Sequence, residues 1–465
     1  MLPENHNIIS RTLPISEFQK RFFIEWLIEP NECTYNISQI HKLSGQLDKK
    51  RLKNSCKEFI ERNEVVHARY SKKGESCYYG DFSINNFFHE LTFGDSKEAE
   101  RQIQVLLFQP FDLTKGPLLR IFLIELNQKN NSQEFYFFFV CHHIICDGVW
   151  MYEFFEQVRD GYNETTKHVS YANHQEISFT EAVKEESKYQ NTDFKSRARR
   201  FWLNFIGDTS LRTDLSALMN IKIPNEEISN KNGAVIHFNL NRKQTHFLRT
   251  YASRNNVTLF VTLLALYGFV LSKYSLQKNF LISYPVDTRS KKFKKAIGCL
   301  VNNIPAKFVL KGINSLSELI AVLGDQRRQV KRFQNYSSIN IIQDLIDSKG
   351  PQTDVYMNIG FGQTYLNTIP LGLDELKSSA LNSSWSKNSI YEISLLYDDY
   401  RDDCIKFKLE YRKSFFTSYL MKNFLDSFYE AIDIFIKRGD LSEPYTLMRP
   451  AEYDQVVKEW NRTDV

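Results

Sequence analysis

The chain has 465 residues, about three times a typical domain length, so a single small module is excluded and two sizeable hydrophobic cores are expected. Hydrophobic residues make up 42% and charged residues 25% of the sequence, an ordinary balance for a folded protein that excludes disorder on a large scale. The formal net charge of +5 is slight for this length and gives no general case for nucleic-acid binding.

The sequence also carries features that bear on secretion, membrane insertion and the redox state of the compartment. The N-terminus lacks a charged start followed by an apolar stretch, so no secretory signal is indicated. The longest apolar run, residues 259–271, is too short to span a bilayer and is typical of a buried helix. Seven dispersed cysteines without a CxxC pair indicate free thiols in a reducing compartment. We therefore expect a cytoplasmic protein.

The first half of the chain predicts a helix and then a hairpin. Residues 47–63 carry apolar side chains at helical spacing, with Asp48 as the N-cap. Residues 118–126 and 134–141 form two strands, and the second is nearly all apolar, so it is expected in the middle of a sheet with both faces buried. A polar loop follows, and a new helical pattern begins at Val149.

The second half repeats these ingredients after a polar, pattern-free linker at 163–176. The expected elements are strand 234–240, helices 242–254 and 257–274, strand 280–285, helix 315–334, strand 355–361, a strand pair near 389–411 and helix 417–437. Two α/β lobes joined near 163–180 are the predicted organisation.

Two short basic runs interrupt the even distribution of charge, at residues 195–200 and 289–295. Each is expected to be solvated surface, and the alternative is a binding site for an acidic partner or a phosphate.

The chemistry of the chain is expected in "CHHIICDGVW" at 141–150, after the apolar strand. Adjacent residues of extended chain point to opposite sides, so one of His142 and His143 is expected to be internal scaffolding. A metal site needs three converging ligands and this segment supplies at most two, so a metal is not expected. An acid/base or positioning histidine is favoured.

The rest of the segment suits that role. Asp147 is expected to cap the following helix or to pair with a buried arginine. Gly148 permits close backbone approach, and its N–H at the positive helix end is suited to a developing negative charge. Neither a GxSxG nucleophile motif nor a phosphate-binding glycine loop is present, so direct transfer between two bound substrates is the expected reaction type.

The pattern H-H-x-x-x-D-G resembles the signature of the condensation-domain superfamily of nonribosomal peptide synthetases, which is related to chloramphenicol acetyltransferase and other CoA-dependent acyltransferases. Further stretches resemble family motifs along nearly the whole chain, at 13–26, 35–66, 111–120, 258–274, 284–289, 297–308 and 459–465.

The sequence also departs from the family. Residues 62–67 read RNEVVH where the family has RHE-x-L-R, and Trp150 replaces a common serine. The first of these motifs is expected to support structure, so the departures leave the substrate class open. The segments "GVW" and 357–363 resemble the epimerisation branch, whereas "IGCLVNN" and the last seven residues favour condensation.

The resemblance implies an α/β (α+β) fold with two chloramphenicol acetyltransferase-like lobes, arranged as a V-shaped pseudo-dimer with a tunnel between them. The expected divisions are an N-terminal lobe at 1–170, a C-terminal lobe at 171–449, and a linker towards an adenylation domain at 450–465.

Site residues follow from the same resemblance. His143 is the implied catalytic residue, with His142, Asp147, Gly148 and Arg289 supporting it, and Arg289 is expected to pair with Asp147 across the lobes. Trp150 and Asn302 are candidates for the tunnel wall.

The implied activity is peptide-bond formation: a donor acyl group passes from a carrier-protein thioester to the α-amine of an acceptor aminoacyl thioester. No cofactor is expected to bind directly, because the substrates arrive on 4'-phosphopantetheine arms of upstream and downstream carrier proteins. An adjacent adenylation domain is also expected as a partner, whereas nucleic acid and membrane are not. The isolated domain is expected to be monomeric. The alternatives are an acyl-CoA-dependent N- or O-acyltransferase, an epimerisation domain, or a catalytically inactive docking platform.

Overall fold

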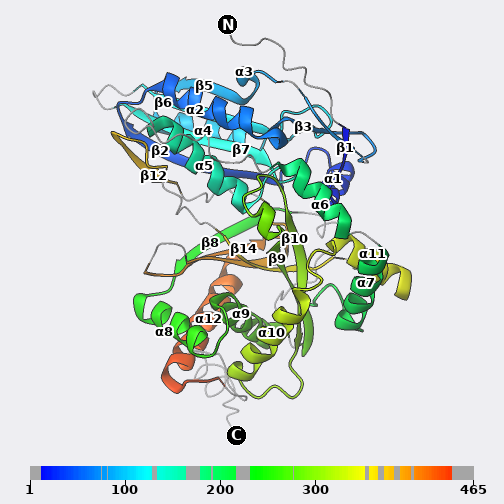
Figure 1. Ribbon diagram of the computed structural model, residues 1–465. Coiled ribbons are helices and arrows are strands. Elements are labelled where there is room, and N and C mark those ends of the chain that lie inside the picture. The colour runs from blue at the N-terminus through cyan, green and yellow to red at the C-terminus, as the bar shows by residue number, and fades with distance from the viewer. Residues whose placement is uncertain are drawn as a thin grey trace.

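The computed structural model describes residues 12–74, 76–80, 82–127, 133–163, 178–189, 192–215, 231–275, 277–350, 356–364, 371–381, 388–399 and 403–441. The predicted linker at 163–176, apart from its first residue, the predicted lobe boundary at 170/171 and the predicted linker at 450–465 lie outside these residues. Within the described residues the chain forms two lobes, the N-terminal one above and the C-terminal one below in Figure 1.

A five-stranded sheet with the order β12-β2-β7-β6-β5 forms the N-terminal lobe. Its strands are β2 (Asn36–Gly45), β5 (Phe88–Phe93), β6 (Leu119–Leu126), β7 (Glu134–His142) and β12 (Leu376–Ala380). A small sheet of β1 (Thr12–Pro14), β3 (Ala68–Tyr70) and β4 (Ser76–Tyr79) lies beside it. The helices are α1 (Glu17–Ile28), α2 (Lys49–Arg62), α3 (Ile84–Phe87), α4 (Ser96–Leu107) and α5 (Gly148–Asn163), with the short 3-10 helix η1 (Glu64–His67).

The predicted hairpin is confirmed, and β7 lies in the middle of the sheet as expected. Strands β6 and β7 pair antiparallel, and β7 is buried from Phe135 to His142. The Phe139 ring packs on Phe154 of α5. The opposite face of the strand carries Tyr136, whose hydroxyl donates to Glu100 of α4. Helices therefore cover both faces of this strand, which explains its nearly continuous apolar sequence.

A six-stranded sheet with the order β10-β9-β11-β13-β14-β8 forms the C-terminal lobe. Its strands are β8 (Gly233–Asn239), β9 (Asn279–Asp287), β10 (Val301–Val309), β11 (Ile359–Gln363), β13 (Ile393–Asp398) and β14 (Lys406–Arg412). The helices are α7 (Thr192–Ile206), α8 (Arg242–Arg254), α9 (Leu259–Ser275), α10 (Leu316–Val330), α11 (Ser338–Lys349) and α12 (Ser418–Arg438), and residues 291–293 form the 3-10 turn η5. Helices α8, α9, α10 and α12 cover the sheet face that points away from the N-terminal lobe (Figure 1).

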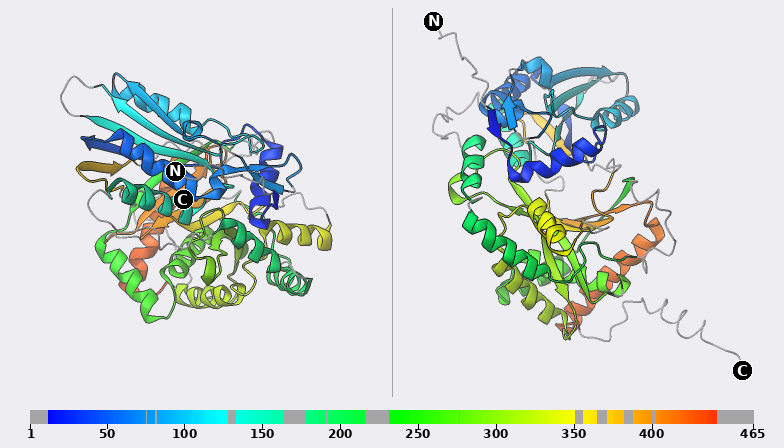
Figure 2. Two further views of the ribbon diagram at one scale, coloured as in Figure 1. Left: turned by 45° about the horizontal axis from the view of Figure 1, so that its top comes forward. Right: turned by 90° about the vertical axis from the view of Figure 1, so that its right-hand side faces the viewer.

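Two segments from the second half of the chain join the N-terminal lobe. Strand β12 pairs antiparallel with β2, and Figure 2 shows the gold β12 beside the blue β2 in its left view. The loop after β9 buries Phe293, Ala296 and Ile297 in the N-terminal core. Parts of the second half of the chain therefore belong to the sheet and the core of the N-terminal lobe.

Helix α6 (Phe179–Tyr189) also packs on the N-terminal lobe, where Phe179, Ala182 and Val183 are part of the core. Its first turn is capped by Glu64, whose Oε1 accepts hydrogen bonds from Ser178 Oγ at 2.6 Å and from the Thr180 N–H at 2.8 Å. The motif at 62–67 therefore has the expected structural role.

Among the described residues no single helix is long and apolar enough to cross a membrane; α8 and α9 pass that test only together and are bent by 112° at their junction.

Candidate active site

The end of β7 holds the two histidines in place through backbone hydrogen bonds. The His142 N–H donates to the Leu118 carbonyl at 3.0 Å, and the His143 N–H donates to the Tyr35 carbonyl at 2.8 Å. The chain then turns through residues 144–147 and enters α5 at Gly148, which is exposed. The predicted succession of strand, loop and helix is confirmed, and Gly148 stands at the positive end of the helix.

His142 is internal, as expected for one of the two. It is 3% exposed, and its Nδ1 accepts a hydrogen bond from the Ile144 N–H at 3.2 Å. Burial lowers the pKa of His142 to about 3, so the ring is neutral at physiological pH and acts as an acceptor that fixes the loop.

His143 is partly exposed, and its ring stacks on Phe22 with the centroids 4.7 Å apart. The Cys299 sulfur lies 3.9 Å from Nδ1, so Nε2 is the ring nitrogen on the opposite side from Cys299. Burial and the positive charge of Arg21 lower the pKa of His143 to about 4, while Asp147 acts in the opposite direction. The imidazole is therefore neutral at physiological pH and able to accept a proton.

Asp147 combines both of its predicted roles. It is 4% exposed, and its Oδ1 accepts from the N–H groups of Val149 and Trp150, each at 3.1 Å, which caps α5. Its Oδ2 accepts from Arg289 Nη2 at 2.7 Å and from the Leu300 N–H at 2.9 Å. One carboxylate thus joins the histidine loop to a segment that follows β9 of the other lobe.

The predicted pair between Asp147 and Arg289 is confirmed, and it is buried, with side-chain exposures of 5% and 1%. The Arg289 guanidinium also donates to the Ala296 and Gly298 carbonyls, each at 2.9 Å, and to Asp287 Oδ1 at 3.0 Å. Burial alone would lower the pKa of Arg289, but Asp147 and Asp287 more than offset it, so the pKa ends above its usual value. The arginine remains charged and holds residues 287–300 in one shape.

Trp150 does not line a tunnel, contrary to the prediction. It is 0% exposed and packs against the rings of Phe59, Phe139 and Phe154 in the N-terminal core. The side chain is on the face of α5 that covers the sheet, so its bulk contributes to packing.

Asn302 was also predicted to line the tunnel, and this is wrong as well. It is 2% exposed, and its Nδ2 donates to the carbonyls of Gln334 and Tyr336 at 2.8 and 2.7 Å. Its Oδ1 accepts from the Ser338 N–H at 3.0 Å. The amide fixes the start of α11 to β10.

Helix α1 contributes residues that the sequence did not single out. The Ser16 and Gln19 side chains form a capping box at its N-terminus. Gln19 also donates from Nε2 to the Ile144 carbonyl at 2.8 Å, which ties the helix to the histidine loop. This contact places Arg21 and Phe22 beside His143. The only sequence signal was the first family motif, which gave no role for either residue.

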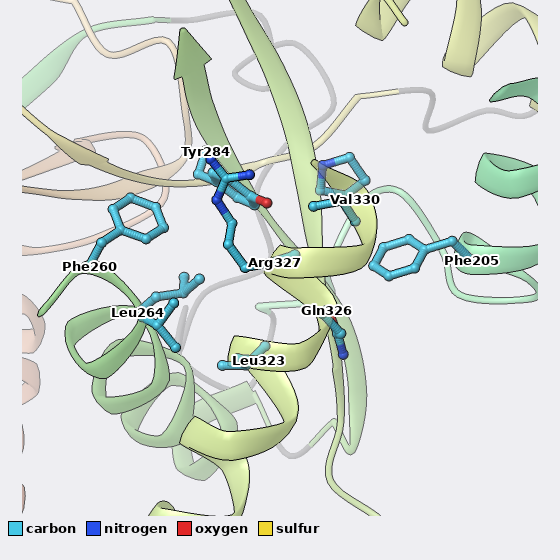
Figure 3. Close-up of a pocket in the computed structure, with 11 residues that line it drawn as sticks. Phe205, Phe260, Leu264, Tyr284, Leu323, Gln326, Arg327 and Val330 are labelled. Atoms are coloured by element: carbon cyan, nitrogen blue, oxygen red, sulfur yellow. The ribbon is translucent and has the colours of Figure 1, made fainter. Parts of the chain in front are cut away.

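One cavity lies in the C-terminal lobe, as Figure 3 shows. Phe260, Leu264, Tyr284, Leu323 and Arg327 are among its lining residues, and none of the lining residues belongs to the histidine loop. Its empty space, about 250 Å³ with its open mouth included, is below the roughly 300–1,000 Å³ of ligand pockets. We interpret it as a packing gap and not as the substrate site.

In the described part of the chain, no group of three or more His, Cys, Asp and Glu side chains is arranged to hold a metal ion.

The comparisons with known proteins agree on one family. A family model described as a condensation domain matches residues 9–457. Gramicidin S synthase 2 of Aneurinibacillus migulanus is 24% identical over 465 residues, which cover 97% of this chain and 10% of that protein. Tyrocidine synthase 3 of Brevibacillus parabrevis is 26% identical over 467 residues, which cover 96% of this chain and 7% of that protein. The chain spans a tenth or less of the length of these relatives.

Solved structures share the fold at low sequence identity. A four-domain nonribosomal peptide synthetase bound to AMP and glycine gives a TM-score of 0.81 at 16% identity, covering 96% of this chain and 35% of the other. The starter condensation domain of rhizomide synthetase gives a TM-score of 0.74 at 15% identity, and the match covers 95% of this chain and 100% of the other. VibH, described as a condensation enzyme, gives a TM-score of 0.72 at 17% identity, and the match covers 90% of this chain and 96% of the other. The predicted fold class is confirmed.

Proposed function

Because this chain belongs to the condensation-domain family, we propose that it transfers an acyl group from a thioester to an amine and thereby forms an amide bond. Membership of this family supports acyl transfer. Amide formation between two carrier-bound substrates is the specific reaction proposed here.

The observation that carries the proposal is the state of His143. Its imidazole is neutral, partly exposed and fixed at the end of a buried strand, while the carboxylate that orients its loop is fully engaged by Arg289 and three backbone N–H groups. A neutral imidazole near the substrates can accept a proton or orient an amine.

In the proposed reaction, the α-amine of the acceptor attacks the carbonyl carbon of the donor thioester. His143 Nε2 takes a proton from the attacking nitrogen, the carbon–sulfur bond breaks, and the leaving thiolate is protonated. The thioester is already activated, so the reaction draws on no nucleotide. Holding two tethered reactants together supplies a large share of the acceleration.

The tethers are 4'-phosphopantetheine arms on two carrier proteins, which would deliver donor and acceptor from opposite ends of a tunnel between the lobes. The outer face of α1 is our candidate for a carrier-docking surface. Ile24, Leu27 and Ile28 recur at helical spacing there and are 44%, 49% and 73% exposed. Exposed apolar side chains grouped on one helix face are typical of protein-binding surfaces.

A single-turnover assay tests the proposed function. Donor and acceptor carrier proteins loaded with a panel of acyl and aminoacyl groups are mixed with the chain, and the acceptor carrier is analysed by mass spectrometry. We expect a condensed product on the acceptor carrier with at least one pair.

Two other outcomes would contradict this reaction. Product formed only from free acyl-CoA would indicate the CoA-dependent acyltransferase instead. Loss of α-hydrogen from a single loaded substrate, detected as deuterium exchange in heavy water, would indicate epimerisation.

A further inference from the structure

We propose that Arg21 is a second catalytic residue, whose guanidinium stabilises the negative charge that develops on the donor carbonyl oxygen when the amine attacks. This inference rests on the proposed amide-forming function. It adds a group that stabilises the oxyanion, a role that His143 does not have in the proposed reaction.

Arg21 and His143 both contact the ring of Phe22. The Arg21 Cζ is 4.3 Å from the centroid of the Phe22 ring, and that ring stacks on His143. The positive charge acts on the groups around the histidine: it lowers the pKa of His143 itself, and it partly opposes the rise that burial causes in the pKa of Tyr35, Tyr391 and Cys299. These groups come from both lobes, so Arg21 stands where the lobes meet.

Among the described residues the guanidinium has no hydrogen-bonding or ionic partner, and its contact is with the Phe22 ring. Its Nε is buried without a hydrogen bond, and no ion pair joins Arg21 to another residue in the described ranges. Glu25, one turn further along α1, is engaged with the Tyr35 hydroxyl. A partly buried cation and a desolvated N–H without acceptors cost free energy, and an anionic ligand group would offset that cost.

Arg289 shows what a structural arginine looks like in the same protein. Its guanidinium reaches two carboxylates and two carbonyls, and only 1% of its side chain is exposed. Arg21 is partly exposed and makes none of these contacts. The difference points to a group that arrives with the substrate.

The charge of Arg21 also acts on Tyr391 of the C-terminal lobe, in the direction that lowers its pKa. Tyr391 packs over Gly360 of β11, where a Cβ would lie 2.4 Å from the tyrosine ring. Its hydroxyl is 3.0 Å from Ser283 Oγ and accepts from Asn303 Nδ2 at 3.0 Å. Because those bonds hold the phenol, Tyr391 is already engaged, whereas the buried Nε of Arg21 has no acceptor among the described residues and is available for an incoming carbonyl.

The chemistry balances with these groups alone. As the amine nitrogen bonds to the carbonyl carbon, the π electrons of the carbonyl move to oxygen, where Arg21 stabilises the oxyanion. His143 removes the proton from nitrogen. The oxyanion then reforms the carbonyl, the carbon–sulfur bond breaks, and the proton on His143 passes to the thiolate.

The test is amide formation by Arg21→Met and Arg21→Lys over a range of loaded-carrier concentrations, with a donor and acceptor pair that the wild type condenses. Arg51→Met is the matched control, because Arg51 also stacks on an aromatic ring, at 4.9 Å from Tyr162, and has a buried, unpaired Nε. We expect Arg21→Met to lower kcat by about 100-fold or more with KM changed less than about threefold, Arg21→Lys to recover part of the rate, and Arg51→Met to keep it.

A pH profile separates catalysis from folding. Without the Arg21 charge the pKa of His143 rises, so the acidic limb of the profile should move to higher pH in Arg21→Met but not in Arg21→Lys, which keeps the charge; a loss of rate caused by misfolding alone would not give this pattern. A rate within threefold of wild type, a loss confined to KM, or an unmoved acidic limb would each overturn the proposal. If Arg21→Met does not fold, Arg21→Gln takes its place beside Arg21→Lys, with the same criteria. Absence of product from the wild type would instead refute the proposed function.

Discussion

At the scale of single residues, Asp147 is the residue on which the site depends most. Its two oxygens accept four hydrogen bonds, two from the first turn of α5 and two from the segment after β9. The histidine loop and the other lobe are therefore fixed by one charge, and that charge is compensated by one arginine.

Breaking this pair should destabilise the protein strongly. Asp147→Ala and Arg289→Ala each leave a buried charge without its partner, which costs about 3–5 kcal/mol. Chemical denaturation measures this as a fall in the free energy of unfolding. Asp193→Ala is the control, because its pair with Arg197 is 78% and 61% exposed and should contribute less than about 1 kcal/mol. Unchanged unfolding curves for both site variants would contradict the buried pair.

Sequence reasoning identified the residues that make contacts within or close to their own motif. His142, Asp147 and Arg289 sit as predicted, because alternation along a strand, helix capping and the need of a buried carboxylate for a cation are local or pairwise rules. Trp150 and Asn302 were misplaced because a motif does not say which face of its helix or strand is covered. Arg21 was missed because its proximity to His143 arises only when α1 packs on the loop.

At the scale of elements, the loop between β9 and β10 depends on Gly298. Its φ of +154° is rarely adopted by other residues, and an added Cβ would lie 2.1 Å from the Phe179 ring of α6. This close approach lets the Gly298 carbonyl accept from Arg289.

Gly298→Ala should therefore lower both stability and the rate of the reaction, because the loop must shift from α6 and take Arg289 with it. We expect a loss of about 1–3 kcal/mol in the free energy of unfolding from the strained backbone. Gly94→Ala is the control, since nothing lies within 4 Å of its added Cβ. Recovery in the double variant with Phe179→Ala would attribute the defect to the ring contact, and a Gly298→Ala protein as stable as wild type would refute it.

The apolar face of α1 gives a second prediction at this scale. Leu27→Glu and Ile28→Glu should weaken binding of a loaded carrier protein by about tenfold or more, because a charge replaces apolar surface that the interface buries. Titration calorimetry with a non-hydrolysable acyl carrier measures the change. Val105→Glu on α4 is the control, since Val105 is 56% exposed on another helix. Equal affinity for all three variants would exclude this face as the docking surface.

Helices with a clear apolar period were predicted well: α2, α8 and α12 begin and end within two residues of their expected limits, and Asp48 caps α2. Strand β11 begins at Ile359, later than the predicted residue 355. Strand β12 was not expected. Its sequence LKSSA lacks the branched and aromatic residues typical of strands, and it forms because β2 offers an edge to pair with.

At the scale of the whole molecule, the two lobes are held together by exchange of chain. Strand β12 and residues 293–300 leave the C-terminal half and enter the N-terminal sheet and core. The basic run at 289–295 takes part in this exchange: its lysines are exposed as expected, whereas Arg289 and Phe293 are buried.

Acid should destabilise the folded protein through its buried histidines. His41 on β2 is 0% exposed, and burial lowers its pKa from 6.5 to about 4. Between these pH values the unfolded chain binds a proton there that the folded chain does not, so stability present above pH 6.5 is lost as pH falls towards 4. His142 and His143 act in the same direction.

The contribution of His41 can be measured by comparing unfolding free energies at pH 7 and pH 4.5. At about 1.4 kcal/mol per pKa unit, His41→Gln should reduce the loss on acidification by about 3 kcal/mol, while keeping a polar partner for Gln39. His246→Gln, at an exposed position of α8, should leave the loss unchanged. A loss of the same size in His41→Gln as in wild type would contradict this assignment.

The central claim is that His143 performs the chemistry of an amide-forming acyl transfer. The most direct test is the single-turnover rate of amide formation by wild type, His143→Ala and His246→Ala with one loaded donor and acceptor pair. We predict a rate at least about 100-fold lower for His143→Ala, an unchanged rate for His246→Ala, and equal melting temperatures for all three. A His143→Ala protein that forms the amide as fast as wild type would contradict the account.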